Sequence, residues 1–340
     1  MNPQSSFYNP AATNGVGLME IVFWALPGVA FFVFPDNLSF GAQVLIMALY
    51  AMSLGLILGF AGIVTLGHAA FFGIGAYSTG WIALAGWHEP ITATFAGGAA
   101  AAALALVVGP IVLRLSGLPL MMMTLAIGAV LFEAANKFGW LTGGENGLSG
   151  IEFAPVLNLF PWSVFGQTSY LYCLAWLFVM FAIFRSLVSS PFGLALQGVR
   201  ENALRMRLVG APVSAHLIRV YTISAFMAGV AGSLSAQVTG FVGLDVLAIE
   251  LSINGIIMLV LGGVGSIYGG PLGAAVYMVL KDFAANWDPY NWMAAIGLFL
   301  IFVVLFGRNG LIGLGQRILP KAFLISLPRT QRMVSRRQAT

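Results

Sequence analysis

Residues Gly59–Gly75 have the sequence GFAGIVTLGHAAFFGIG and lie where one apolar run ends and another begins. Five glycines, a threonine and a histidine interrupt a stretch that is otherwise apolar. Glycines at this density disfavour a continuous helix. Within a membrane, backbone outside a helix is tolerated only where other protein segments surround it. The stretch therefore predicts a broken or re-entrant helix packed against protein.

The composition of the whole chain supports a membrane setting. Of its 340 residues, 59% are apolar and only 8% are charged, and the mean hydropathy is +0.94. Soluble domains carry about a quarter charged residues, so this chain lacks the charge to cover a water-facing surface. The sequence therefore predicts an all-α, polytopic transmembrane helical bundle.

The number of spans follows from their length. A helix needs about 20 mainly apolar residues to cross the hydrocarbon core, which gives about ten candidate spans, including the broken or re-entrant segment. The candidates are Met19–Phe34, Gly41–Phe60, Phe71–Gly86, Ile91–Leu113, Leu118–Phe138, Ser169–Leu187, Ser214–Gln237, Ile249–Leu261, Ile267–Phe283 and Trp292–Phe306. We find no convincing sequence repeat among them, although an inverted structural repeat often leaves only a faint trace.

Basic residues set the expected orientation. They concentrate in one internal segment, Arg185–Arg207, and in the tail from Arg308 onward, with long uncharged runs between. Basic loops stay on the cytoplasmic side. We therefore expect a cytoplasmic N-terminal segment (1–18), a transmembrane domain (19–307) and a basic cytoplasmic tail (308–340), with both termini inside. No basic residue precedes the first apolar run and no cleavage site is evident, so we expect no removable signal peptide.

A short cytoplasmic helix is predicted over residues 192–210. The surrounding segment, PFGLALQGVRENALRMRLVGAP (Pro191–Pro212), contains good helix formers and carries too many charges for a span. One interpretation is a docking helix seated in a groove of a soluble partner, with its charges setting the register. The other is an amphipathic loop helix resting on lipid headgroups. The pattern alone leaves both open.

Polar residues inside apolar segments are candidates for a solute path because their burial is costly. His68 either lines such a path or is a packing histidine with a hydrogen bond. Gln237 and Asn254 either line a polar pore or bond to a neighbouring helix. The sequence leaves both interpretations open for all three.

No catalytic or cofactor motif is present in the sequence. Three dispersed histidines and the single Cys173 predict no metal cluster and no nucleophilic site. The run GGVGSIYGGP (Gly262–Pro271) has the wrong glycine spacing for a dinucleotide fingerprint and lacks the lysine of a phosphate loop. We expect no catalytic residue, no metal, no cofactor and no nucleic acid on this chain.

Four long blocks of the sequence carry a resemblance. They are GFAGIVTLGHAAFFGIGAY (Gly59–Tyr77), TGGENGLSGI (Thr142–Ile151), RENALRMRLVG (Arg200–Gly210) and ELSINGIIMLVLGGVGSIYGGPLGA (Glu250–Ala274). In this order and spacing they resemble the branched-chain amino acid permeases of ATP-binding-cassette importers, specifically the larger of their two homologous membrane subunits. The resemblance covers most of Gly41–Phe306.

The resemblance implies partners and roles for particular residues. It implies a homologous second permease subunit, two cytoplasmic ATPase subunits that hold ATP and Mg, and an extracytoplasmic solute-binding protein, in the lipid of a bacterial cytoplasmic (inner) membrane. The residues it places against the ATPases are Arg200, Glu201, Asn202, Arg205, Arg207 and Gly210. It also implies that Gly59–Tyr77 borders the translocation path. The path candidates are then Thr65, His68, Phe71, Gln237 and Asn254.

The expected function is uptake of branched-chain or related amino acids by alternating access, driven by partner ATPases; the chain itself is not an enzyme. A permease of the same class for urea, amides or aromatic acids is one alternative. A secondary transporter driven by an ion gradient is another, although it would place buried carboxylates near the mid-bilayer. A membrane-embedded enzyme is disfavoured by the missing catalytic set.

Overall fold

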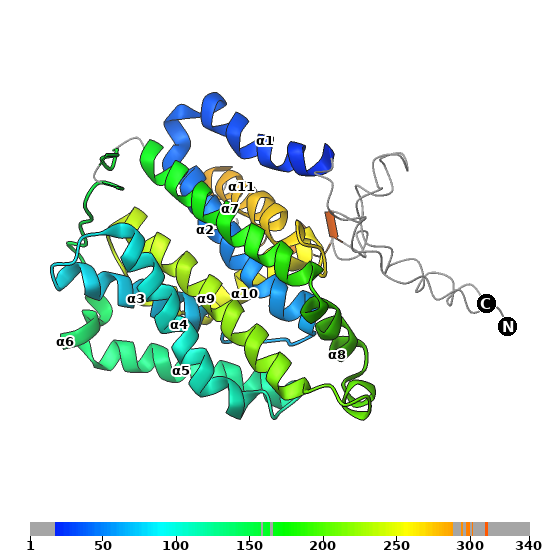
Figure 1. Ribbon diagram of the computed structural model, residues 1–340. Helices are drawn as coiled ribbons and strands as arrows, with labels where there is room; N and C mark the ends of the chain where they lie inside the picture. The colour runs from blue at the N-terminus through cyan, green and yellow to red at the C-terminus, as the bar shows by residue number, and fades with distance from the viewer. Residues whose placement is uncertain are drawn as a thin grey trace.

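The computed structural model describes residues 18–157, 159–163 and 166–287, and beyond them only positions 294, 297–299, 301, 310 and 311 (Figure 1). Within these residues the fold is all-helical and contains no strand, only two isolated bridges. The helices are α1 (Leu18–Val33), α2 (Leu38–Leu54), α3 (Ala69–Leu84), α4 (Pro90–Val112), α5 (Leu118–Lys137), α6 (Gly139–Thr142), α7 (Gln167–Ser189), α8 (Pro191–Leu208), α9 (Val213–Thr239), α10 (Ile249–Gly262) and α11 (Gly269–Trp287). The tighter or wider turns are η2 (Pro35–Asn37), η3 (Gly55–Ala61), η4 (Gly144–Asn146) and η5 (Leu244–Leu247).

The predicted all-α class is confirmed, and the helices begin and end within a few residues of the predicted spans. Five of them are long and apolar enough to cross a membrane. They are Pro35–Ala61, Pro90–Val112, Leu118–Lys137, Gln167–Ser189 and Val213–Thr239. The count of about ten spans therefore stays a prediction. The expected span Trp292–Phe306 and tail 308–340 lie almost entirely outside the described residues, as does segment 1–18 apart from Leu18.

The predicted break in the glycine-rich segment is confirmed. α2 widens into the π-helical turn η3 and stops at Gly62, whose φ of 73° and ψ of 19° are left-handed. Glycine adopts this conformation without the strain that a Cβ would bring, which is why it ends helices so often. Residues 63–68 then run without helix, with Thr65 only 3% exposed and His68 fully buried. α3 starts at Ala69.

A second break shares four of eight residues with the first. Residues 59–66 are GFAGIVTL and residues 240–247 are GFVGLDVL. Both octapeptides have Gly, Phe, Gly and Leu at the same positions, both follow a long helix (α2 or α9), and both precede a shorter one (α3 or α10). The sequence alone showed no convincing repeat, because an octapeptide with four identities is too short a signal. The helices on either side of the two octapeptides make the inverted repeat, which the sequence left open, recognisable.

The two repeats run in opposite directions. α9 begins just after α8, whereas α2 runs toward α8, because Arg200 of α8 contacts Gly59 at the end of η3. The second break thus lies at the far end of the bundle. There the chain turns back: Val242 lies beside Gly80, and Leu247 lies beside Gly73. These glycines are seven helical residues apart, so the chain returns about 10 Å along α3 before α10 begins.

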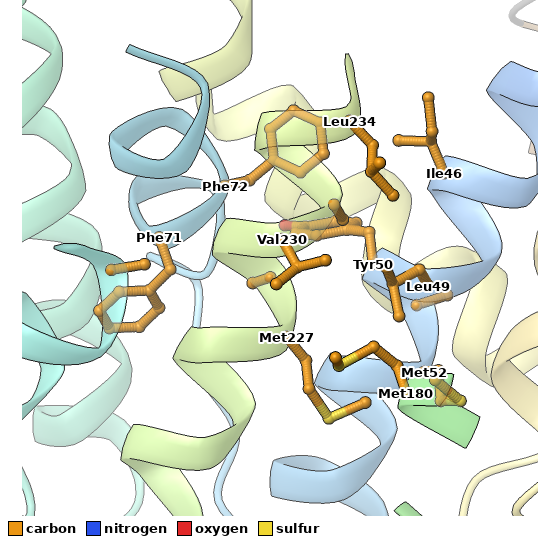
Figure 2. Packing of buried hydrophobic residues seen from close by; sticks show 14 of the residues in the cluster. Ile46, Leu49, Tyr50, Met52, Phe71, Phe72, Met180, Met227, Val230 and Leu234 are labelled. Atoms are coloured by element: carbon orange, nitrogen blue, oxygen red, sulfur yellow. The ribbon is translucent and has the colours of Figure 1, made fainter. Parts of the chain in front are cut away.

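The long helices of the two repeats, α2 and α9, lie at the centre of the bundle. α9 packs most closely on α3 and α4, and α2 packs on α10, α11 and α7, while α2 and α9 contact each other. Figure 2 shows this centre, where Leu49 and Tyr50 of α2 lie near Met227, Val230 and Leu234 of α9. The α3–α9 crossing is very close, since a Cβ on Gly75 would lie 2.5 Å from the Cα of Gly229. Such small residues let helices approach where lipid provides no hydrophobic drive.

Candidate translocation and coupling site

The first break surrounds a buried polar cluster. The Ser53 hydroxyl donates to the Tyr50 carbonyl oxygen (2.7 Å) and lies 2.9 Å from His68 Nε2. The Ser53 hydroxyl has one proton, and it is used in the bond to Tyr50. The hydroxyl therefore accepts a hydrogen bond from His68, so the imidazole of His68 is protonated at Nε2. The His68 ring also lies against those of Tyr50 and Phe71, with centroids 5.4 Å and 5.7 Å away.

Side chains from two other helices bond the backbone of the break. Thr124 of α5 accepts from the Leu66 amide at 3.1 Å, and Ser252 of α10 accepts from the Ala69 amide at 2.9 Å. The second bond caps the start of α3, where helical amides otherwise have no partner. The break is thus held by protein contacts, as the sequence predicted for irregular backbone at membrane depth.

Two buried polar atoms of this cluster have no protein partner. They are Thr65 Oγ1 and His68 Nδ1. Buried polar atoms without a partner are costly and usually mark a water, a ligand or a second conformation. This agrees with the interpretation of Thr65 and His68 as path residues, although their role stays a prediction.

The predicted path residues fall into three separate places. Thr65, His68 and Phe71 lie at the first break, where the Phe71 ring meets that of Tyr221 (centroids 5.2 Å apart) and points away from Phe72 (Figure 2). Gln237 donates to the Pro90 carbonyl oxygen and to Thr94 Oγ1, both at 2.9 Å, and so joins α9 to the start of α4. Asn254 accepts from the Tyr277 hydroxyl at 2.9 Å and lines a groove. The structure does not bring the five together.

Arg200 links α8 to the first break. Its guanidinium donates to the Gly59 carbonyl oxygen, and a Cβ on Gly62 would lie 2.8 Å from its Cγ. Its Nη1 also lies close to Gly265, in the turn that follows α10. One side chain thus touches the last turn before the first break and the end of the second repeat's short helix. The sequence predicted Arg200 only as a partner contact, because a long-range bond to a backbone oxygen leaves no local signal.

The predicted helix over 192–210 is present as α8 but is interrupted, which corrects the expectation of one continuous helix. Asn202 has non-helical angles (φ −159°, ψ 95°), and its Oδ1 accepts from the Arg205 amide at 2.9 Å. Asn202 therefore caps a second short helix. Asparagine is a strong capping residue, so the signal was in the sequence.

The second part of α8 forms an exposed tip. Leu204, Leu208 and Val209 are 66%, 79% and 85% exposed, and Arg205 and Arg207 are exposed beside them. An apolar patch rimmed by charge marks an interaction surface. Glu201, Asn202 and Gly210 are exposed as well, so every predicted coupling residue lies on or next to this surface.

The described residues contain no group of three or more His, Cys, Asp and Glu side chains that could hold a metal ion. The surfaces of α4, α5 and α7 instead expose large apolar side chains, among them Val107, Met122 and Phe178. Such surfaces suit contact with lipid. Broken helices inside an apolar bundle, with a separate exposed tip, define a multi-pass membrane transport protein.

Comparison with known proteins gives the family. A family described as the permease component of the branched-chain amino acid transport system matches residues 38–306. The chain belongs to this family, and it is a transport subunit rather than an enzyme. No solved structure matches the chain.

Individual relatives agree with the family assignment. The chain is 26% identical to the high-affinity branched-chain amino acid transport system permease protein LivM of Salmonella typhimurium, over 88% of this chain and 76% of the relative. It is 27% identical to LivM of Escherichia coli, over 81% of this chain and 69% of the relative. A shorter match, 32% identical over 40% of this chain, is to the permease protein BraD of Pseudomonas aeruginosa.

Proposed function

We propose that this chain is the membrane-spanning permease subunit of an ATP-binding-cassette importer that translocates branched-chain or related amino acids by alternating access. Its partners in this proposal are a homologous second permease, two cytoplasmic ATPase subunits and an extracytoplasmic solute-binding protein. ATP and Mg bind the ATPases rather than this chain. The assembly lies in a bacterial cytoplasmic membrane, with α8 and both termini on the cytoplasmic side.

The observation that carries the proposal is the bond from Arg200 to Gly59. A motor that moves the exposed tip of α8 would move the Arg200 side chain with it. That side chain touches both the end of η3 and the turn after α10. Rigid coupling through packed helices converts a small displacement into a change between two arrangements. The tip would seat in an ATPase groove through Leu204 and Leu208, with Arg205 and Arg207 fixing its orientation.

The test separates docking from coupling in the assembled transporter. Arg205→Glu with Arg207→Glu reverses the charge of the tip, and we expect at least tenfold less ATPase subunit to co-purify with the permease. Arg200→Ala leaves the tip intact, so we expect normal assembly but at least tenfold less solute taken up per ATP hydrolysed. Arg114→Glu, in the exposed loop after α4, is the matched control and should change neither quantity.

Two results would contradict the proposed mechanism, and a third would change only the substrate class. Normal assembly and coupled uptake in the Arg205→Glu, Arg207→Glu variant would exclude α8 as the docking element. Uptake by the permease without ATPase subunits, under a proton or sodium gradient alone, would favour the secondary transporter. Uptake of urea, amides or aromatic acids in preference to amino acids would keep the mechanism and change the substrate class.

A further inference from the structure

A groove of about 400 Å³ opens between α2, α9, α10 and α11. Its volume falls within the roughly 300–1,000 Å³ typical of small-molecule sites. Its polar lining side chains are Gln43, Ser235, Thr239, Asp245, Glu250, Asn254, Tyr277 and Lys281. The helices α10 and α11 beside the groove also expose the large apolar side chains of Ile249, Ile253, Val279 and Phe283, so the groove is a polar site within an apolar surface.

The groove places opposite charges on different walls. Asp245 comes from η5 and Glu250 from the first turn of α10, whereas Lys281 comes from α11. Asn254 lies one turn further along α10 and is held by the Tyr277 hydroxyl. The ammonium group of a zwitterionic ligand could bind the carboxylates of the groove. The ligand's own carboxylate could bind the lysine ammonium and the asparagine amide.

The remaining walls are apolar. Ile46 and Met47 of α2, Leu251 and Met258 of α10, and Met278 of α11 line the groove together with its polar groups. Methionine side chains adapt to branched shapes and make favourable apolar contacts. Urea and simple amides carry neither the charges nor the apolar side chain that these walls would accommodate.

The groove begins at the end opposite α8 and reaches into the bundle. Asp245 and Glu250 flank the point where the second break turns back beside α3, and Met258 lies nine residues from the start of α10. Nine residues of helix are about 13 Å. A solute entering from the side away from the ATPases would therefore meet the charged groups first and the apolar wall further in.

We propose that this groove is a binding site for a zwitterionic amino acid with an apolar side chain. Asp245 and Glu250 receive the ammonium group, Lys281 and Asn254 receive the carboxylate, and the Met and Ile side chains receive the aliphatic part. The inference rests on the proposed function and gives its amino acid solute a location on this chain. It also explains why the second break carries acidic residues where the first carries Val64 and Ala69.

The experiment measures thiol accessibility in the assembled transporter. Ser235→Cys, on the α9 wall of the groove, is labelled with a methanethiosulfonate reagent, and Gln167→Cys, exposed at the start of α7, is the control outside the groove. The natural Cys173 is buried and serves as the blank in the unmodified chain. We expect L-leucine to slow labelling of Ser235→Cys at least fivefold and to leave Gln167→Cys unchanged. We expect at least tenfold weaker protection by 3-methylbutylamine, which lacks the carboxylate of leucine, and by 4-methylpentanoate, which lacks its ammonium group. Urea should also protect at least tenfold less well.

A second arm tests the charges. In the Ser235→Cys background, Glu250→Gln and Lys281→Gln should each raise the half-protecting leucine concentration about tenfold, because a charge-assisted hydrogen bond is lost. Asp282→Asn, exposed beside Lys281 but outside the groove lining, is the matched control and should not change it. If Ser235→Cys fails to fold, Gln43→Cys on the α2 wall replaces it.

The outcomes separate this inference from the proposed function. Unchanged labelling in leucine, in a preparation that takes up leucine from its binding protein, overturns the site and leaves the function standing. Better protection by urea or by the lone amine overturns the zwitterion assignment. Absence of ATP-driven amino acid uptake in the unmodified transporter, with no protection by leucine, rejects the function and the site together.

Discussion

The two breaks in the bundle share a sequence and differ in what surrounds them. The first, at Gly59–Leu66, is enclosed and is tied to α8 by Arg200. The second, at Gly240–Leu247, carries an exposed Asp245 that lines a groove. At the position of Asp245 the first break has the half-buried Val64. Two similar sequences thus serve a mechanical connection at one end and an open polar surface at the other.

A left-handed glycine ends the long helix at both breaks, but it is Gly62 at the first and Gly240 at the second. The surroundings determine what each break is used for. The residues that differ between the two octapeptides vary with the surroundings, since an enclosed break tolerates apolar side chains and an open one tolerates charge.

Exchanging the two variable residues should give the largest effect. Val64→Asp places a carboxylate inside the enclosed break, and we expect it to lower the free energy of unfolding by about 3 kcal/mol. Asp245→Val removes an exposed charge and should change it by no more than about 0.5 kcal/mol. Unfolding midpoints in detergent measure both. Equal losses in the two variants would show that the breaks have equivalent surroundings.

Alanine at the second glycine of the motif should give a smaller difference in stability between the two breaks. Gly62 is left-handed (φ 73°), whereas Gly243, its counterpart, is extended (φ −99°, ψ 176°). We expect Gly62→Ala to cost about 1–2 kcal/mol, and the new Cβ would also press on Arg200.

Gly243→Ala is the matched variant for this prediction. Its Cβ would meet only the side chains of Asp245 and Phe241, which can move, so the expected loss is below about 0.5 kcal/mol. The same unfolding measurement in detergent applies. A loss at Gly243 as large as at Gly62 would mean that both glycines are required for packing rather than for backbone conformation.

The smallest expected effect concerns the capping of the shorter helices. Ser252 accepts from the first amide of α3, and Ser252→Ala should cost about 1 kcal/mol. Amide hydrogen exchange at Ala69 should become faster in this variant. Ser235→Ala, half-buried on α9, is the control and should leave exchange at Ala69 unchanged. Unaltered protection of Ala69 in Ser252→Ala would show that the hydroxyl does not stabilise the start of α3.

Much of this architecture was predictable from local pattern. The helix class, the approximate bounds of the long apolar helices and the break after Phe60 followed from apolar run length and glycine clustering. The exposed position of Arg205 and Arg207 followed from a charge density too high for a span. The kink at Asn202 was visible as a strong capping residue but was not recognised, because helix formers flank it on both sides.

The candidate site was less predictable. Gln237 and Asn254 each bond to a neighbouring helix, one of the two roles that the sequence left open, and the structure places them apart, with Gln237 against α4 and Asn254 against α11. Which helix a polar side chain faces depends on the rotation and crossing of whole helices. A single span carries too little information to set these quantities, because several neighbours compete for the same face.

Local sequence is enough to identify a helical membrane protein with a broken glycine-rich helix and a charged segment outside the apolar bundle. These properties depend on local composition and on the cost of placing charge or free backbone in hydrocarbon. The packing of the helices is needed to show that two short motifs form an inverted pair, that Arg200 reaches Gly59, and that Asp245, Glu250 and Lys281 surround one groove. Each of these is a contact between residues far apart in the chain, and such contacts exist only once the helices have packed.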